Sequence, residues 1–425
     1  MRVQQEGDET KKLYIITHMY PYGFGEKSFI EPELKILLES NRFDITIICN
    51  APVAAVQTSE VDSRIKIVRI PKINLFSRPF FTFGKIINYF WDKQNQEERI
   101  AVAASLKKWD AYYESIMYYV QAKLFEDELN RLGLNFNNAY VYTYWFYVQT
   151  LAVIYRKNNG EECKLISRIH GFDLYKERMK GGRQPFRKMM DQYIDKLFFI
   201  AETGRRYYIK NYDVSNPNKY ELCRLGTFGV EDISKYTHRK NTEGPFLLVS
   251  CSNIIELKQI NLIIEALYTI ENYKIKWIHF GDGTERQRIE ELAHTLLDCK
   301  KNISYEFKGN VSNQDIHRFY QNNYVDCFIT TSRTEGCPVS IQEAMSYGIP
   351  IIATDVGEIP LMINGNGYLL SNFPSVDEIS AAIESVINMS AEDKKRAQEK
   401  SRLLWEEYFN AEENHKKFNE KILEM

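Results

Sequence analysis

Two glutamates, Glu335 and Glu343, stand eight positions apart in the stretch TEGCPVSIQEAMSYGIPIIATDVGEIP, which begins at Thr334. Glutamates are usually solvated surface groups, but the neighbours of these two are small or apolar, which indicates a buried corner. A proline follows the first glutamate by three residues, and a Gly–Ile–Pro sequence comes ten residues later. Because proline suits a helix start and glycine with proline suits its end, we expect a short helix over residues 338–347.

The N-terminus of this expected helix could bind an anion. The amide groups of Val339 and Ser340 would have no acceptor within the helix and would face the loop that holds Glu335. Glu343 would lie roughly 7 Å further along the axis, and its side chain would tilt back toward the same ligand. Two carboxylates beside an anion-binding helix end suit a ligand with hydroxyls on both sides of a phosphate, such as a nucleotide sugar. The alternative is one capping glutamate and one exposed glutamate.

Length and composition set the broad class. A chain of 425 residues predicts two domains of about 150–250 residues each. The apolar fraction of 44% and charged fraction of 26% are typical of a soluble globular protein. The net charge of −2 gives no electrostatic reason to expect a nucleic-acid partner. Seven scattered cysteines without a CxxC pair, and no apolar leader or run of 18 apolar residues, predict a cytoplasmic protein without a disulfide framework or a zinc site.

Short apolar runs alternate with longer amphipathic stretches, which is the pattern of strand and crossover helix in a parallel sheet. A helix is expected over Ser28–Ser40. The expected strands of a first set begin at Leu13, Asp44, Lys66, Ala139, Lys164 and Lys196. Those of a second set begin at Phe246, Lys274, Ile303, Asp326 and Ile349. The predicted fold class is therefore α/β, with two Rossmann-like, doubly wound domains facing each other across a cleft.

We predict an N-terminal domain over residues 1–237, a C-terminal domain over 238–405, and a final helix over 406–425 that packs back on the first domain. An aromatic-rich helical insert, about residues 72–134, interrupts the first domain. Two interpretations of this insert remain open. It could pack on the core of the first domain, or its segment 76–91 could form a patch that contacts a membrane or a lipid tail.

The E-x7-E spacing followed by EAMSYGIPIIATDVGEIP resembles the hallmark of family 4 retaining glycosyltransferases, which have the GT-B fold. Further segments resemble family motifs in the family's order: the glycine loop at Gly23, Gly25 and Glu26, the HG-x-D segment at His170, Gly171 and Asp173, the strand-to-linker segment from Arg224, the phosphate-binding strand–loop–helix with Lys258, and the loops HFGDG and FKGNV from His279 and Phe307. The resemblance covers about residues 12–50 and 140–410 and leaves the insert uncovered.

The resemblance implies a role for each matching residue. Glu343 would bind the ribose hydroxyls, Glu335 the donor-sugar hydroxyls, and Lys258 the diphosphate leaving group. His170 would lie near the reacting anomeric carbon, so that His170, Lys258 and Glu335 are the expected catalytic residues. Further residues expected to contact the nucleotide sugar are Gly25, Asn253, Gly281, Lys308, Gly309, Arg333, Gly336, Cys337, Val339 and Ser340. The acceptor would be bound by Glu26, His170 and Asp173.

One position departs from the family pattern. The family usually has an arginine five residues before the lysine, where this chain has Asn253. Asparagine can hydrogen-bond a phosphate oxygen but brings no charge. Either another cation replaces the arginine, with Arg333 preferred to Arg224, or the enzyme is slow, or the chain only binds its ligand.

The implied activity is hexosyl transfer with retention, from a nucleotide-sugar donor to a hydroxyl of a glycan or lipid-linked acceptor, in the synthesis of a surface polysaccharide such as a capsule. We expect a UDP-sugar rather than GDP-mannose, and a location in the cytoplasm or at the inner face of the cytoplasmic membrane. The chain has no D-x-D motif, so we expect no metal and no other cofactor. The alternatives are a catalytically impaired binding subunit and a sugar-nucleotide epimerase or hydrolase. The GDG sequence at Gly281 lacks the full dinucleotide fingerprint, and Cys337 has no visible histidine partner, so a dehydrogenase and a thiol nucleophile are disfavoured.

Overall fold

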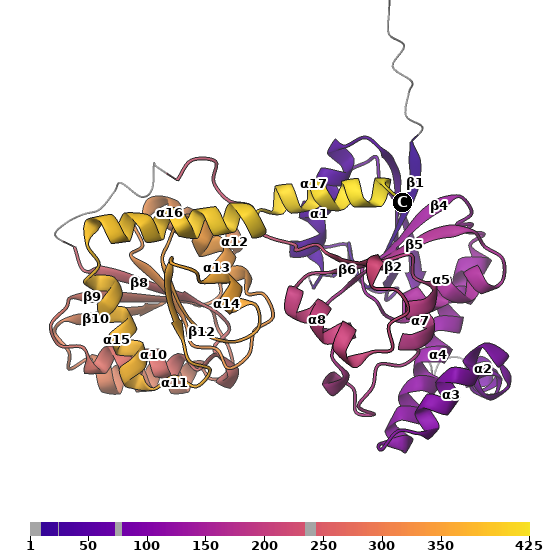
Figure 1. The fold of residues 1–425 in the computed structure, drawn as a ribbon, viewed down its shortest axis with the longest axis horizontal. Helices are drawn as coiled ribbons and strands as arrows, with labels where there is room; N and C mark the ends of the chain where they lie inside the picture. Colours follow the sequence, from indigo (N-terminus) through magenta and orange to yellow (C-terminus); the bar gives the residue numbers. More distant parts are fainter. Residues whose placement is uncertain (1–9, 24, 73–78, 234–243) are drawn as a thin grey trace, which may run out of the picture. The chain divides into compact units, whose positions relative to one another are not determined.

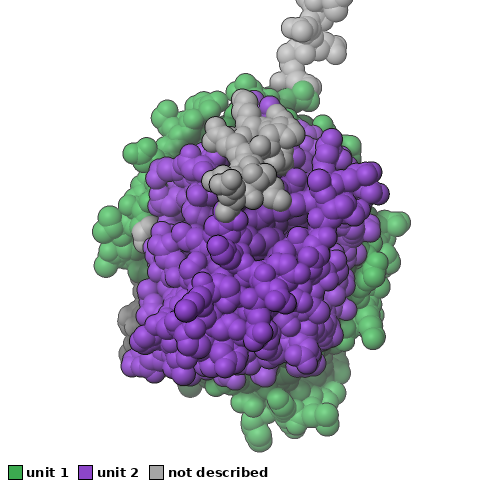
Figure 2. All heavy atoms as spheres, turned by 90° about the vertical axis from the view of Figure 1, so that its left-hand side faces the viewer, with its two compact units in different colours: residues 1–223, 415–425 green, residues 224–414 purple. Residues whose placement is uncertain are grey.

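The computed structural model describes residues 10–23, 25–72, 79–233 and 244–425, and these form two compact units (Figures 1 and 2). Unit 1 consists of residues 1–223 and 415–425, and unit 2 of residues 224–414. The predicted domain boundary at residue 237 falls in the segment 234–243, which lies outside the described residues.

Unit 1 is built on a seven-stranded parallel sheet with the order β3-β2-β1-β4-β5-β6-β7. Its strands are β1 Lys11–Thr17, β2 Phe43–Ala51, β3 Lys66–Pro71, β4 Ala139–Thr143, β5 Cys163–Ile169, β6 Lys196–Phe199 and β7 Tyr220–Leu222. The first six were expected, whereas β7 has only three residues, too few to show a period-two pattern. The strand order reverses between β1 and β4, and ligands of doubly wound sheets bind at the carboxyl ends of strands near such a point.

Helices flank this sheet (Figure 1). They are α1 Lys27–Glu39, α5 Val148–Asn158, α6 Gly171–Leu174, α7 Arg187–Tyr193, α8 Glu202–Asn211 and α17 Ala411–Leu423, with 3-10 turns η3 Lys176–Arg178 and η4 Pro217–Lys219. The helix expected over Ser28–Ser40 is α1, shifted by one residue. Phe418 of α17 is fully buried, and its ring centroid lies 5.2 Å from that of Tyr142. The last helix of the chain thus contributes to the core of unit 1.

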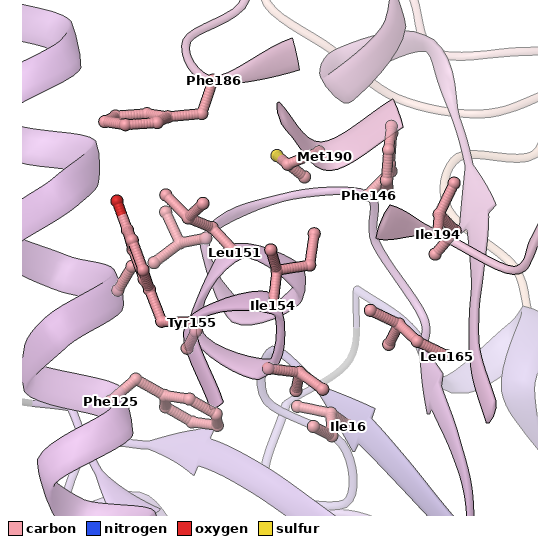
Figure 3. Packing of buried hydrophobic residues seen from close by; sticks show 14 of the residues in the cluster. Ile16, Phe125, Phe146, Leu151, Ile154, Tyr155, Leu165, Phe186, Met190 and Ile194 are labelled. Carbon is pink, nitrogen blue, oxygen red and sulfur yellow. The ribbon is translucent and has the colours of Figure 1, made fainter. Parts of the chain in front are cut away.

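The insert forms three helices, α2 Pro79–Trp91, α3 Gln96–Ala103 and α4 Lys108–Arg131, joined by the turn η2 Lys93–Asn95; residues 73–78 lie outside the described part. One face of α4 is buried in the core of unit 1. Figure 3 shows Phe125 of α4 near Tyr155 of α5, with Phe186 packed on the same cluster. This accords with the packing interpretation of the insert, while Trp91 and Trp109 on its outer side are 80% and 83% exposed.

Unit 2 is built on a six-stranded parallel sheet with the order β10-β9-β8-β11-β12-β13. Its strands are β8 Phe246–Cys251, β9 Ile275–Phe280, β10 Ile303–Phe307, β11 Cys327–Thr330, β12 Ile351–Thr354 and β13 Gly367–Leu370. Its helices are α10 Ile260–Thr269, α11 Arg286–Leu297, α12 Asn313–Asn322, α13 Val339–Ser346, α14 Ile359–Met362, α15 Val376–Ile387 and α16 Ala391–Tyr408, with the 3-10 turn η5 Glu256–Lys258. Of the strands in unit 2, only the short edge strand β13 was not predicted. The two doubly wound α/β units confirm the predicted fold class.

None of the helices in the described residues combines the length and the apolar character that a membrane span requires.

Candidate functional site

The first site lies in unit 2, at the carboxyl ends of its strands. Lys258, at the end of the turn η5 that follows β8, places its Nζ 2.5 Å from Oε1 of Glu335, which stands between β11 and α13. The side chains of Lys258 and Glu335 are 21% and 12% exposed, so both can reach a ligand. The structure therefore joins two residues that the sequence separates by 77 positions.

Backbone contacts hold the two loops together. The amide of Arg333 donates to the carbonyl of Leu257 over 2.8 Å. The hydroxyl of Thr331 donates to the carbonyls of Lys258 and Gln259 over 3.2 and 2.9 Å. Thr331 is fully buried and was not singled out from the sequence, since a threonine after a strand gives no signal of such a contact. These bonds fix the backbone from which Lys258 extends.

Gly357 allows the backbone of its loop to lie close to the backbone of Glu335 and Gly336. The amide of Glu358 donates to the carbonyl of Gly336 over 2.9 Å. Gly357 has φ +60°, and a Cβ atom there would lie 2.2 Å from the carbonyl oxygen of Glu335. Only glycine fits this position, so the loop that carries Glu335 depends on it.

Helix α13 begins at Val339 and ends at Ser346, one residue inside the predicted range at each end, and Pro338 is its N-cap. Glu343 on this helix is 4% exposed, and burial raises the pKa of its carboxyl group to about 7. Asn313 donates a hydrogen bond of 3.0 Å to Oε1 of Glu343, and Nε2 of His317 lies 4.0 Å from the same oxygen. Glu343 is thus not the exposed glutamate of the alternative interpretation but a buried acid with one amide donor.

Two cysteines lie among these groups. Burial raises the pKa of the Cys251 thiol to about 12. The charge of Glu343 acts in the same direction, and that of Lys258 opposes it. Both charged groups therefore lie near the end of β8. Burial also raises the pKa of Cys337 to about 12, with Glu358 adding to this effect, so its side chain is a neutral thiol. This charge state does not suit a nucleophile.

The loops HFGDG and FKGNV, which begin at His279 and Phe307, contact each other through their backbones. The amide of Gly281 donates to the carbonyl of Gly309 over 2.9 Å. A Cβ atom on Gly281, which has φ +137°, would lie 1.9 Å from the carbonyl oxygen of Ser252, so this position also requires glycine. Lys308 is paired with Glu306 at 2.5 Å. Asn253 is exposed on the loop after β8, two residues beyond Cys251.

The two arginines considered as replacements for a phosphate-binding arginine differ in their surroundings. Arg224 lies 3.5 Å from Oε2 of Glu358, a fully buried carboxylate, and its guanidinium stacks 5.3 Å from the ring of Tyr408. Its charge is therefore balanced within the protein. Arg333 is exposed, and its backbone is bonded to the loop that carries Lys258.

The remaining predicted residues lie in unit 1. The carboxylate of Glu26 accepts hydrogen bonds from the backbone amides of His18, Met19 and Tyr20, over 2.7–2.9 Å, and from the indole nitrogen of Trp145 over 2.7 Å. Four protein donors thus surround Glu26, which shapes the turn after β1. Gly25 in this turn is exposed, with open space where a Cβ atom would stand.

His170 and Asp173 follow β5. Asp173 is fully buried and accepts hydrogen bonds from the amides of His170, over 2.6 Å, and Phe146, over 2.7 Å; burial raises its pKa to about 7. The His170 ring stacks on Trp145, with centroids 4.3 Å apart, and neither ring nitrogen has a hydrogen-bond partner in the described part of the chain. Burial and the charge of Arg168 lower the pKa of His170 to about 3, so the imidazole is neutral. Trp145, which the sequence did not single out, connects His170 to Glu26.

Residues 233–403 match the model of the family described as Glycosyl transferases group 1. The O-antigen biosynthesis glycosyltransferase WbnH of Escherichia coli is 22% identical over 201 residues, which cover 47% of this chain and 53% of that protein. The UDP-N-acetylglucosamine–peptide N-acetylglucosaminyltransferase GtfA subunit of Streptococcus agalactiae is 26% identical over 150 residues, 34% of this chain and 28% of that protein. The chain thus matches about half or less of the length of these relatives.

Two solved structures resemble the whole chain. The apo form of the lipopolysaccharide outer core galactosyltransferase WaaB has a TM-score of 0.64 at 15% identity, and the match covers 97% of this chain and 99% of that one. Anabaena HepE in complex with UDP and glucose has a TM-score of 0.61 at 13% identity, covering 98% of this chain and 100% of that one. The fold is therefore that of the GT-B glycosyltransferases.

Proposed function

We propose that the chain is a retaining hexosyltransferase of family 4, which moves a sugar from a UDP-sugar, in preference to GDP-mannose, to a hydroxyl of a glycan or lipid-linked acceptor in surface polysaccharide synthesis. The observation that carries this proposal is the pairing of Lys258 with Glu335 beside α13, the helix that holds the buried Glu343. The family match over residues 233–403, which includes all three residues, supports it.

On the donor side, the ammonium of Lys258 binds the diphosphate and neutralises the charge that develops on the leaving group. Glu335 accepts hydrogen bonds from hydroxyls of the donor sugar, and Glu343 accepts them from the ribose. The backbone from Gly336 to Ser340 lies against the sugar, with the first amides of α13 directed toward negative charge. The loops at Gly281 and 308–309 complete the nucleotide-sugar site of unit 2.

On the acceptor side, neutral His170 offers one donor and one acceptor nitrogen to the reacting sugar, and Glu26 and Asp173 hold the turns on which this site depends. We assign no protein nucleophile. The leaving phosphate takes the proton of the acceptor hydroxyl as the new glycosidic bond forms on the face from which the diphosphate departs. The absence of a D-x-D motif from the sequence supports transfer without a divalent metal.

For a lipid-linked acceptor, the insert would place the enzyme at the inner face of the cytoplasmic membrane. Phe83, Phe90 and Trp91 on α2 are 63%, 47% and 80% exposed, a density of exposed aromatic side chains that suits a membrane interface. Sedimentation with vesicles of anionic phospholipid tests this contact, and equal sedimentation of the parent and a Trp91→Ser variant would refute it.

The function itself is tested by calorimetric titration with UDP, GDP and ADP and their sugars, followed by transfer assays over a panel of acceptors with and without a metal chelator. We expect a UDP-sugar to bind and Glu343→Ala to weaken this binding by about 1–3 kcal/mol. Failure of every nucleotide to bind would refute the donor site.

Incubation with the donor alone distinguishes the alternative activities. Free sugar or an epimer released without acceptor would identify a hydrolase or an epimerase. Nucleotide binding without transfer to any acceptor would identify a binding subunit, the alternative that Asn253 motivates.

A further inference from the structure

Unit 1 contains a cavity of about 560 Å³ at the carboxyl ends of its strands. Residues directly after β1, β2 and β3 line it, together with the start of α5 and one side of α4. This is the edge of the sheet at which the strand order reverses, between β1 and β4. The volume lies within the range of small-molecule sites in proteins.

One wall of the cavity comes from the insert. Gln121, Leu124 and Phe125 of α4 contribute it, and they lie in the insert that no family motif covers.

The N-terminus of α5 faces this cavity. Val148 and Gln149, the first two residues of the 11-residue helix, both line it. Tyr147 is the N-cap and makes no side-chain capping bond, and the first turn holds no acidic residue. The amides of the first turn thus present positive partial charge to the cavity without a competing carboxylate.

Gln149 gives independent evidence of a polar ligand. The residue is 6% exposed and lines the cavity, and none of the hydrogen bonds among the described residues involves its side-chain amide. An amide that lines a cavity without a protein partner can donate and accept hydrogen bonds with a bound molecule. Lys72, directly after β3, lines the same cavity, is exposed and forms no ion pair with any described residue.

Aromatic rings form the apolar side. The ring centroids of Tyr147 and Phe172 lie 5.4 Å apart, and that of His18 lies 6.0 Å from Tyr147. Burial lowers the pKa of His18, with the charge of Lys72 acting in the same direction and that of Glu26 opposing it. His18 is thus neutral near pH 7 and adds hydrogen-bonding capacity but no charge.

We propose that this cavity binds a sugar that carries a phosphate or carboxylate group, with the anion at the N-terminus of α5 between Gln149 and Lys72 and the sugar ring against Tyr147 and Phe172. This inference rests on the proposed function, because it makes the acceptor of the transfer an anionic saccharide. It concerns a site in unit 1, separate from the donor residues of unit 2, so the two can be tested separately.

The test uses three matched probes: methyl glucoside, the same glycoside with a phosphate on carbon 6, and methyl glucuronide. Their binding to the full chain is measured by calorimetry without any nucleotide. We expect at least one anionic probe to bind about tenfold more tightly than methyl glucoside, since charge-assisted hydrogen bonds and the helix dipole add to the affinity. The tighter of the two anionic probes identifies phosphate or carboxylate as the acceptor group.

Two variants remove this preference by different means. Lys72→Gln should reduce the preference about threefold or more, and Gln149→Glu should abolish it, since a carboxylate would then occupy the anion position while remaining compatible with a helix N-terminus. Lys66→Gln is the matched control, because it removes the same charge from the other end of β3, where Lys66 forms an exposed pair with Asp44.

Equal affinity for all three probes would overturn the proposal, as would a preference unchanged by both Lys72→Gln and Gln149→Glu. A preference lost in Lys258→Ala instead would place the anion in unit 2 and also overturn it. If no UDP-sugar binds to the parent protein while the anion preference is present, the proposed donor site is refuted and the proposed anion site in unit 1 is supported.

Discussion

Lys258 Nζ lies 2.5 Å from Oε1 of Glu335, so the proposed ligand of the diphosphate and the proposed ligand of the donor sugar form an ion pair with each other. The carboxylate holds the lysine beside α13 and also competes with a diphosphate for its charge. The pair is partly exposed, so its contribution to folding is small, in the range of 0–1 kcal/mol for such pairs. Its main effect is therefore expected on ligand binding.

Glu335→Gln separates the two roles of this pair. Without the competing carboxylate, Lys258 is free to bind phosphate, so we expect UDP to bind several-fold more tightly while sugar transfer falls at least 100-fold. Lys258→Ala should weaken UDP binding about 10–100-fold, with little change in melting temperature. Calorimetry and transfer assays measure both effects, and Lys276→Ala on β9 is the control lysine. Weaker UDP binding by Glu335→Gln would contradict this account of the pair.

The missing positive charge at Asn253 predicts a gain of function. Asn253→Arg places a guanidinium on the exposed loop that leads to Lys258, so we expect turnover to rise several-fold and the affinity for UDP to increase. If Arg333 supplies the charge in the parent protein, Arg333→Gln should lower turnover about tenfold or more, and Asn253→Arg should restore part of it. Arg288→Gln, a surface change on α11, is the control. Turnover unaffected by Arg333→Gln would exclude Arg333 from this role.

The raised pKa of Glu343 predicts the direction in which the free energy of unfolding changes with pH. Burial raises its pKa from 4.5 to about 7, so between these values the folded protein holds a proton that the unfolded chain has released. The stability of the parent therefore falls as pH rises through this window. Glu343→Gln has no such group, and its free energy of unfolding relative to the parent should increase by up to about 3 kcal/mol between pH 4.5 and 7. Urea unfolding at several pH values measures this difference; a constant difference would show that Glu343 is ionised throughout.

Unit 1 contains a buried ion pair with the opposite pH behaviour. Arg168 donates to Oε2 of Glu33 over 2.5 Å, and Nδ1 of His415 on α17 lies 3.4 Å from the same oxygen. Burial alone would raise the pKa of Glu33, but the charge of Arg168, with His415 and Tyr142 acting in the same direction, holds it below its usual value of 4.5. The pair thus stabilises the protein above pH 4.5 and loses this effect as the pH falls through the lowered value.

Glu33→Gln would leave the guanidinium of Arg168 buried without its partner, at a cost of about 3–5 kcal/mol. Chemical unfolding near pH 7 measures this loss, with Glu39→Gln on the exposed end of α1 as the control. The difference between Glu33→Gln and the parent should shrink in acid, and a difference independent of pH would contradict the assignment of charge to Glu33.

The sequence predicted eleven strands, all of which are present, because short apolar runs separated by longer amphipathic segments specify strand and crossover helix locally. It missed β7 and β13, which have three and four residues at sheet edges and therefore carry little periodic signal. The sequence also indicated the two glutamates and Lys258 through spacing and resemblance. It gave no signal for Thr331, Trp145 or Gln149, since a single polar or aromatic residue has a functional position only through its neighbours in space.

The amino-acid sequence by itself determined the two α/β units and the helix that carries Glu343, because these depend on local backbone preferences and apolar periodicity. Tertiary structure decided the rest: that Lys258 and Glu335 form a pair, that Glu343 is buried enough to hold a proton near pH 7, and that Gln149 lines a cavity without a partner. These properties arise from distances and desolvation between residues far apart in the chain, which no local pattern encodes.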